Sequence, residues 1–108
     1  MANEEATKLK KEHNCNFVIC LSHLGYKYDE PDKVCDINLA QKTRDIDLIL
    51  GGHTHTFMDK PDSHLNLDGK AVLINQVGWG GIMLGRLDIY FEQNNGRHCK
   101  TCNNLTIS

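Results

Sequence analysis

Residues 45–55 read DIDLILGGHTH, and their pattern indicates the class of fold. The apolar run Leu48 to Leu50 stops abruptly at two glycines, which is typical of a short buried strand that ends in a sharp turn. Upstream, residues 17–21 form another uninterrupted apolar run, FVICL. Runs of this kind predict strands that are covered on both faces, as in the parallel sheet of an α/β protein.

Two helical segments alternate with these strands. Residues 3–14 carry opposite charges four residues apart and a narrow apolar stripe, which predicts a surface helix. Asp36 stands where an N-cap would open a short helix that ends at about Lys42. The order helix, strand, helix, strand predicts an α/β fold with parallel pairing through a right-handed crossover.

The second half of the chain has antiparallel character. Two turn signals, Asp68-Gly69 and Asn95-Gly96, are typical of hairpins between short strands. The strand-like segments around them are residues 65–67, 71–77, 82–92 and 98–107. We therefore expect antiparallel strands after the parallel part.

The 108 residues have room for one domain, and 40% hydrophobic with 24% charged residues is an ordinary globular composition. A net charge of −2 without a basic stripe does not indicate a nucleic-acid partner. Neither a membrane span nor the basic and then apolar pattern of a signal peptide is expected. The compartment of this chain stays unknown.

The cysteines are odd in number and unevenly spaced, which does not suit a disulfide scaffold. They are Cys15, Cys20, Cys35, Cys99 and Cys102. The last two form a Cys-x-x-Cys pair, for which an ordinary surface position is favoured over a zinc or redox site. At least one thiol is expected to be free.

Three histidines follow the two predicted strands directly: His23 after the first, and His53 and His55 after the second. Ligands collect outside the carboxyl ends of strands in open α/β sheets, so both loops are expected to open onto one crevice. Imidazole is the commonest side-chain ligand of metal ions. The alternative is that they are solvated surface histidines. Trp79, between glycines, either lines this site or covers a sheet edge.

The sequence context favours the metal. Residues 45–55 closely resemble the Gly-His-x-His block of calcineurin-like metallophosphoesterases, and residues 18–25 (VICLSHLG) resemble the preceding metal-binding block. GRLD at residues 85–88 looks like a segment that 5′-nucleotidases place after these blocks. The chain thus resembles the C-terminal part of the catalytic domain of that family, over residues 3–94, with residues 95–108 as a terminal hairpin or tail.

The resemblance implies a fragment of an α/β/β/α sandwich whose intact parent hydrolyses phosphate from 5′-nucleotides. It assigns His23 and His53 to one divalent metal, zinc, manganese or similar, and His55 to a second. Related full-length enzymes are periplasmic or on the cell surface. No further catalytic or substrate-binding residue is assigned in this chain, and nothing in the pattern places Asp36, Asp59 or Asp62 near metal.

The family's other blocks, Asp-x-His, Gly-Asp and Gly-Asn-His-Asp/Glu, are N-terminal to these blocks in the family and are not found before residue 18 here. They supply the remaining ligands, the bridging carboxylate and the histidine that helps protonate the leaving group. Two close cations repel each other strongly without a bridging carboxylate, so at most one metal ion is expected here. The isolated chain is expected to be inactive. The alternative is a non-catalytic truncated or split product that binds metal, a complementary N-terminal segment or a second copy of itself.

Overall fold

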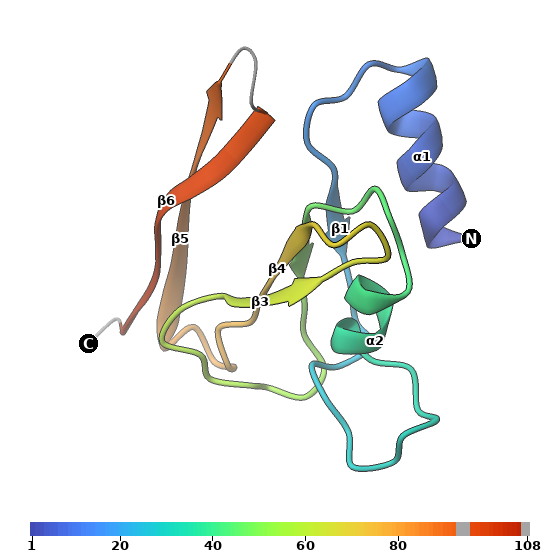
Figure 1. Cartoon of the computed structure of the whole chain (residues 1–108). Coiled ribbons are helices and arrows are strands. Elements are labelled where there is room, and N and C mark those ends of the chain that lie inside the picture. The colour runs from blue at the N-terminus through green and yellow to red at the C-terminus, as the bar shows by residue number, and fades with distance from the viewer. Residues whose placement is uncertain (93–95, 107–108) are drawn as a thin grey trace.

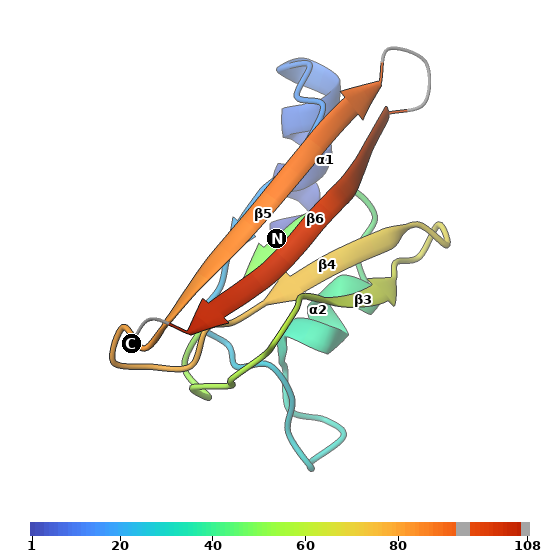
Figure 2. The ribbon, with the colours of Figure 1, turned by 90° about the vertical axis from the view of Figure 1, so that its left-hand side faces the viewer.

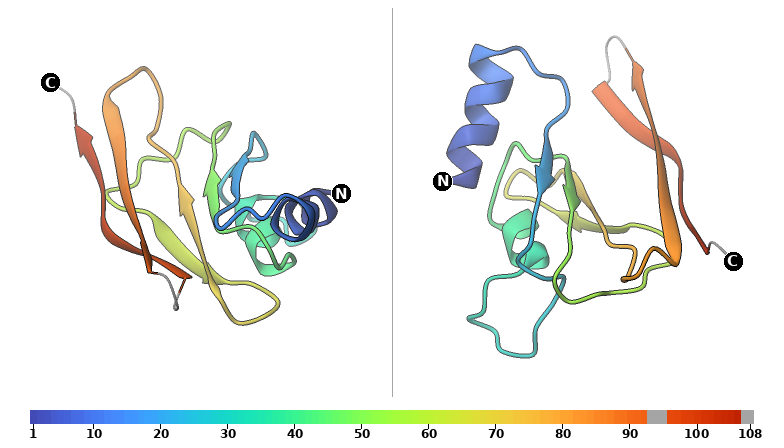
Figure 3. Two further views of the ribbon diagram at one scale, coloured as in Figure 1. Left: turned by 90° about the horizontal axis from the view of Figure 1, so that it is seen from above. Right: turned by 180° about the vertical axis from the view of Figure 1, so that it is seen from behind.

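The structure is a computed structural model that describes residues 1–92 and 96–106. Its elements are α1 (Ala2–Glu12), β1 (Ile19–Leu21), α2 (Asp36–Gln41), β2 (Leu48–Leu50), β3 (Asp62–Leu65), β4 (Ala71–Asn75), β5 (Met83–Glu92) and β6 (Gly96–Thr106). One sheet has the strand order β1-β2-β4-β3, and β5 pairs with β6 in a separate hairpin (Figure 1). The helices lie on one side of the sheet and the hairpin on the other, as Figure 3 shows. The predicted α/β class is confirmed.

Strand β2 lies at the centre of the sheet. It pairs in parallel with β1 and with β4, and its residues Leu48 and Ile49 are buried. The Asp68-Gly69 turn joins β3 to β4 as predicted. The antiparallel strands expected in the second half are confirmed in the pairs β3–β4 and β5–β6, and β4 also pairs in parallel with β2.

Strand β1 forms one edge of the sheet. The prediction that this strand is covered on both faces was wrong, since Ile19 is 51% and Leu21 81% exposed. An edge strand with exposed apolar side chains offers unpaired backbone groups to another strand.

The two aspartates of the DIDLIL stretch fasten α1 to the sheet. Asp47 is buried, accepts the Val18 amide hydrogen bond at 2.8 Å and pairs with Lys10 Nζ at 3.0 Å. Asp45 accepts a hydrogen bond from the Thr7 hydroxyl. The core beneath the helices consists of Ala6, Val18, Ala40, Ile46, Ile49, Val72 and Ile74.

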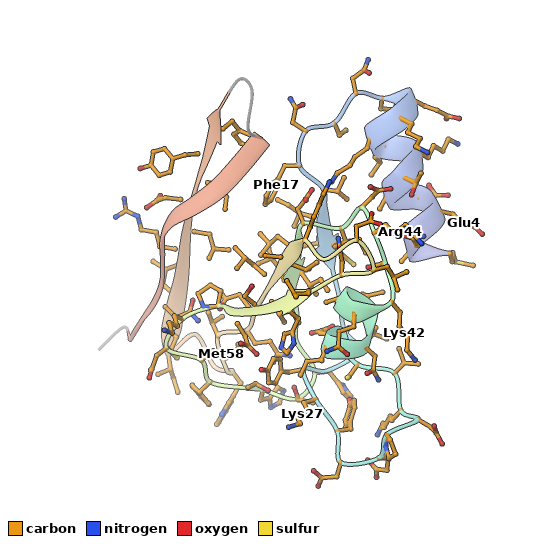
Figure 4. All side chains as sticks on the ribbon, viewed as in Figure 1. Glu4, Phe17, Lys27, Lys42, Arg44 and Met58 are labelled. Atoms are coloured by element: carbon orange, nitrogen blue, oxygen red, sulfur yellow. The ribbon has the colours of Figure 1, made fainter. Side chains whose placement is uncertain are left out.

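The β5–β6 hairpin crosses one face of the sheet (Figure 2). Phe17 lies between the sheet and the hairpin (Figure 4), with its ring edge-on to Phe91 at 5.9 Å between centroids. The buried amides of Asn75 and Asn104 donate to each other at 2.9 and 2.7 Å. A reciprocal amide pair leaves neither side chain unsatisfied, which suits a buried contact between two layers.

A hydrogen-bonded group of Tyr26, Asp62 and His64 attaches the loop after β1 to β3. The Tyr26 hydroxyl donates to Asp62 Oδ2, and His64 Nε2 lies 2.8 Å from the same oxygen. The Tyr26 hydrogen bond, more than His64, holds the pKa of Asp62 below its ordinary value of 3.8. Burial and the neighbouring carboxylate raise the pKa of Tyr26 to about 12.

Tyr26→Phe is expected to lower the free energy of unfolding at neutral pH by about 1 kcal/mol, because the hydrogen bond to a partly exposed carboxylate is lost. The lowered pKa of Asp62 contributes stability above about pH 4 that is lost as the pH falls through the folded value. The raised pKa of Tyr26 contributes stability below about pH 10 that is lost as the pH rises through about 12.

Urea unfolding of wild type and Tyr26→Phe at several pH values measures this difference. The difference in unfolding free energy between the two proteins should be largest between about pH 5 and pH 9 and should become smaller at lower and at higher pH. A difference in unfolding free energy that does not narrow as the pH falls through the folded pKa of Asp62 would contradict the assignment of the bond to an ionised Asp62.

Candidate metal centre

The carboxyl ends of β1 and β2 deliver the predicted histidines to one edge of the sheet. Beyond the strands, the Ser22 amide donates to the Leu50 carbonyl and the Gly51 amide donates to the Asn75 carbonyl, each at 2.9 Å. These bonds continue the parallel pairing into the loops. They bring His23 beside residues 51–56, which we call the histidine loop.

His23 and His53 lie in contact and form what we call the histidine pair. His53 Nδ1 is 3.3 Å from His23 Nε2, and the ring centroids are 4.9 Å apart at an interplanar angle of 66°. One nitrogen can donate a hydrogen bond to the other, with the roles set by the tautomers. The convergence of these two loops, predicted from their place after adjacent strands, is confirmed.

His55 faces a different neighbour. Its ring stacks on Trp79 with centroids 6.3 Å apart and an angle of 27°. Trp79 is 60% exposed, so it lies beside the histidine loop as a partly open aromatic surface. Among the described residues, no group of three or more His, Cys, Asp or Glu side chains is arranged to hold a metal ion.

The histidine loop has an unusual backbone. His53 and His55 have φ angles of +72° and +53°, the left-handed region that residues other than glycine rarely adopt. The Thr54 amide between them donates to the Gly52 carbonyl at 2.9 Å. The loop is therefore the sharply turned form that the sequence allowed, and its two histidines point to different partners. Such strain is typical of functional sites.

Asp36 lies directly beneath the loop, although no pattern in the sequence places it there. The predicted N-cap role was wrong: Cys35 is the N-cap of α2, and Asp36 begins the helix with its side chain fully buried. Asp36 Oδ1 accepts the Ser22 hydroxyl hydrogen bond at 2.5 Å. Asp36 therefore fixes the residue that precedes His23.

Burial raises the pKa of Asp36, and the Ser22 and Gln76 side chains oppose that rise. Ser22 acts through a hydrogen bond of normal geometry, whereas Asp36 Oδ2 has no such partner among the described residues. Gln76 is itself buried against the histidine loop, and sequence reasoning missed it as well.

Comparisons with known proteins show which family the chain belongs to. No family model matches the chain. The "Trifunctional nucleotide phosphoesterase protein YfkN" of Bacillus subtilis (strain 168) is 34% identical over 92 residues, which is 85% of this chain. The 5′-nucleotidase of Rattus norvegicus is 34% identical over 101 residues, covering 82% of this chain. The chain belongs to the 5′-nucleotidase family.

Solved structures agree with this family assignment. A 5′-nucleotidase precursor from Thermus thermophilus matches 98% of the chain with a TM-score of 0.82 and 25% identity. The NAD nucleotidase of Haemophilus influenzae matches in fold, with a TM-score of 0.79 at 23% identity. This 5′-nucleotidase-family chain spans 6% and 16% of the two curated relatives and 22% of each solved structure.

Other sequence features of this 5′-nucleotidase-family chain have no contact with the histidine pair in the described residues. His13 is exposed at the end of α1, and His64 pairs with Asp62. The side chains of Cys99 and Cys102 lie outside the part that the structure describes. Within the described part, no helix has the length and apolar character needed to cross a membrane.

Two adjacent glycines allow a matched test of how the histidine loop packs. A Cβ atom on Gly51 would lie 2.1 Å from Asp36 Oδ2, whereas one on Gly52 would lie 3.5 Å from His23 Nδ1. Gly51→Ala is expected to destabilise the protein by about 1–3 kcal/mol, because the buried carboxyl group must move. Gly52→Ala should cost much less, because its Cβ meets only an ordinary contact.

Urea unfolding gives the two costs, and imidazole ¹⁵N chemical shifts report the contact between His23 and His53. We expect Gly51→Ala to change both measurements. Equal costs for the two alanines would show that Asp36 does not pack tightly beneath Gly51.

Proposed function

We propose that this chain supplies part of the metal site of a nucleotide phosphoesterase, with His23, His53 and His55 as ligands of divalent metal. The observation that carries the proposal is the 3.3 Å separation between His53 Nδ1 and His23 Nε2. Tetrahedral zinc with bonds of about 2.0–2.1 Å holds two imidazole nitrogens about 3.3 Å apart. The histidine pair therefore fits two ligands of one zinc-sized ion.

The position of His55 supports a separate role for it. Its ring stacks on Trp79 while the ring of His53 faces His23. The family resemblance assigns His55 to a second metal ion, and a histidine that turns away from the pair agrees with that assignment. Because neutral imidazoles cannot offset the repulsion between two cations, we expect at most one ion on this chain alone.

The proposed reaction of the intact parent is hydrolysis of 5′-nucleotides to nucleosides and phosphate. Metal ions supply the polarisation of a phosphoryl oxygen and the activation of a water molecule. The residues of this chain would hold and orient the metal. His23 and His53 present neighbouring ring nitrogens to it, and the backbone of the histidine loop fixes the direction of the His53 ring. The bridging carboxylate and the proton donor for the leaving group must come from other residues, so we propose that the isolated chain is inactive.

A complementary N-terminal segment of the same family is the proposed partner. The free edge of β1, with Ile19 and Leu21 exposed, supports this, because an added strand would bury these side chains and pair the free backbone groups. The small share of the relatives' length that the chain spans supports it as well. A second copy of this chain, or a non-catalytic role in metal binding, is the alternative.

Zinc, manganese or cobalt is expected to bind weakly to the wild-type chain, and His53→Ala should lower the affinity at least about tenfold because one of two paired nitrogens is lost. Titration calorimetry measures both. His13→Ala, which removes an exposed histidine at the end of α1, is the matched control and should bind like wild type. Equal affinities for all three proteins would remove the histidine loop from metal binding.

The isolated chain is expected to release no phosphate from AMP above background, because parts of the catalytic unit are absent and such losses remove most of the rate. Adding a separately expressed N-terminal segment with Asp-x-His, Gly-Asp and Gly-Asn-His should restore metal-dependent hydrolysis. His55→Ala should abolish the restored activity. Chelator-sensitive hydrolysis by the isolated chain would show that the ligand count is wrong.

A further inference from the structure

We propose that Gln76 is a positioning residue whose side-chain amide holds the histidine loop in the conformation that turns His53 toward His23. The proposal rests on the proposed function, because it names the residue that prepares the histidine pair for metal. Gln76 follows the last residue of β4 and is 2% exposed. Its side-chain hydrogen bonds are to Gly52, Thr54 and Thr56 of the histidine loop.

The amide of Gln76 binds the loop on both sides of its two histidines. Gln76 Nε2 donates to the Gly52 carbonyl at 2.9 Å, and Gln76 Oε1 accepts the Thr56 amide hydrogen bond at 3.0 Å. Gly52 precedes His53, and Thr56 follows His55. The two bonds therefore span the whole segment in which the backbone is left-handed.

A third contact fixes the middle of the loop. Thr54 Oγ1 lies 3.2 Å from Gln76 Nε2 and also accepts the Tyr26 amide hydrogen bond at 3.0 Å. Thr54 stands between the two histidines, so its side chain connects the loop both to β4 and to the segment after His23. Gln76 is the residue that contacts the loop at its start, middle and end.

The chemistry of these contacts requires a carboxamide. A backbone carbonyl on one side needs a donor, and a backbone amide on the other side needs an acceptor, so the direction of the amide is fixed. A carboxylate lacks the donor, and a thioether lacks both a donor and a strong acceptor. Two non-glycine residues with positive φ persist only where their surroundings hold them, and the Gln76 amide provides that support.

The neighbouring residue offers a matched control. Asn75 is also a buried amide at the end of β4, but its side chain pairs with Asn104 in β6. Replacing Asn75 with Leu removes a buried amide of similar size and cost, and leaves every side-chain bond to the histidine loop in place. Gln76→Met also removes a buried amide, and with it the side-chain hydrogen bonds to the histidine loop.

Three measurements on the full chain test the proposal. In Gln76→Met the Thr56 amide should exchange with solvent at least about tenfold faster, since it loses its acceptor. The imidazole ¹⁵N shifts of His23 and His53 should move toward those of separate, solvated rings. Zinc affinity should fall about tenfold or more, as is typical when a residue that orients a ligand is lost. Asn75→Leu should lower stability but keep all three at wild-type values.

The outcomes separate this inference from the proposed function. Faster Thr56 exchange and shifted imidazole signals in Gln76→Met alone support the role of Gln76, even where wild type takes up no zinc and the metal role fails. Unchanged exchange and shifts in Gln76→Met, or equal changes in Asn75→Leu, overturn it. Should Gln76→Met not fold, Gln76→Glu keeps the acceptor for Thr56 and loses the donor to Gly52. It should then protect the Thr56 amide while the imidazole shifts still move, and wild-type shifts would overturn the proposal.

Discussion

The structure depends on the parallel pairing of β2 with a strand on each side. Leu50 accepts a hydrogen bond from the Ser22 amide, and the Gly51 amide donates to the Asn75 carbonyl. These bonds join the carboxyl ends of β1, β2 and β4, where the loops that follow the three strands begin. Because all three strands point the same way, their carboxyl ends meet, and His23, the histidine loop and Gln76 share one edge of the sheet.

Two buried polar residues let the loops take their form at that edge. Asp36 holds Ser22 and occupies the space that a side chain on residue 51 would need. Gln76 satisfies the polar backbone groups of a loop that makes few backbone hydrogen bonds of its own. Buried polar groups are costly unless they are paired, so Gln76 stabilises the loop only as long as the loop backbone supplies its partners, and Asp36 depends in the same way on the Ser22 hydroxyl.

The sequence predicts the strands and the histidines of the site better than it predicts the buried polar residue that holds the histidine loop. Leu48 to Leu50 form a strand because an apolar run ends at glycines, and histidines that follow adjacent parallel strands must converge. Gln76 could not be predicted in its role, since its partners lie 20 and 24 residues away and depend on the register between β2 and β4. The available signal was a pair of amides, Asn75 and Gln76, that interrupts the apolar run of β4. Periodicity likewise could not tell that β1 is an edge strand, because apolar runs look alike with and without a neighbour.

The exposed edge strand β1 leads directly into the histidine pair. Leu21, the most exposed residue of β1, stands two positions before His23. A strand that paired in parallel with the free side of β1 would have its carboxyl end beside the carboxyl ends of β1 and β2. The residues after it would then lie beside the histidine pair. Covering the apolar edge and bringing further groups to the pair would then be one event. Binding of a complementary segment and binding of metal should therefore favour each other, because each orders residues that the other needs.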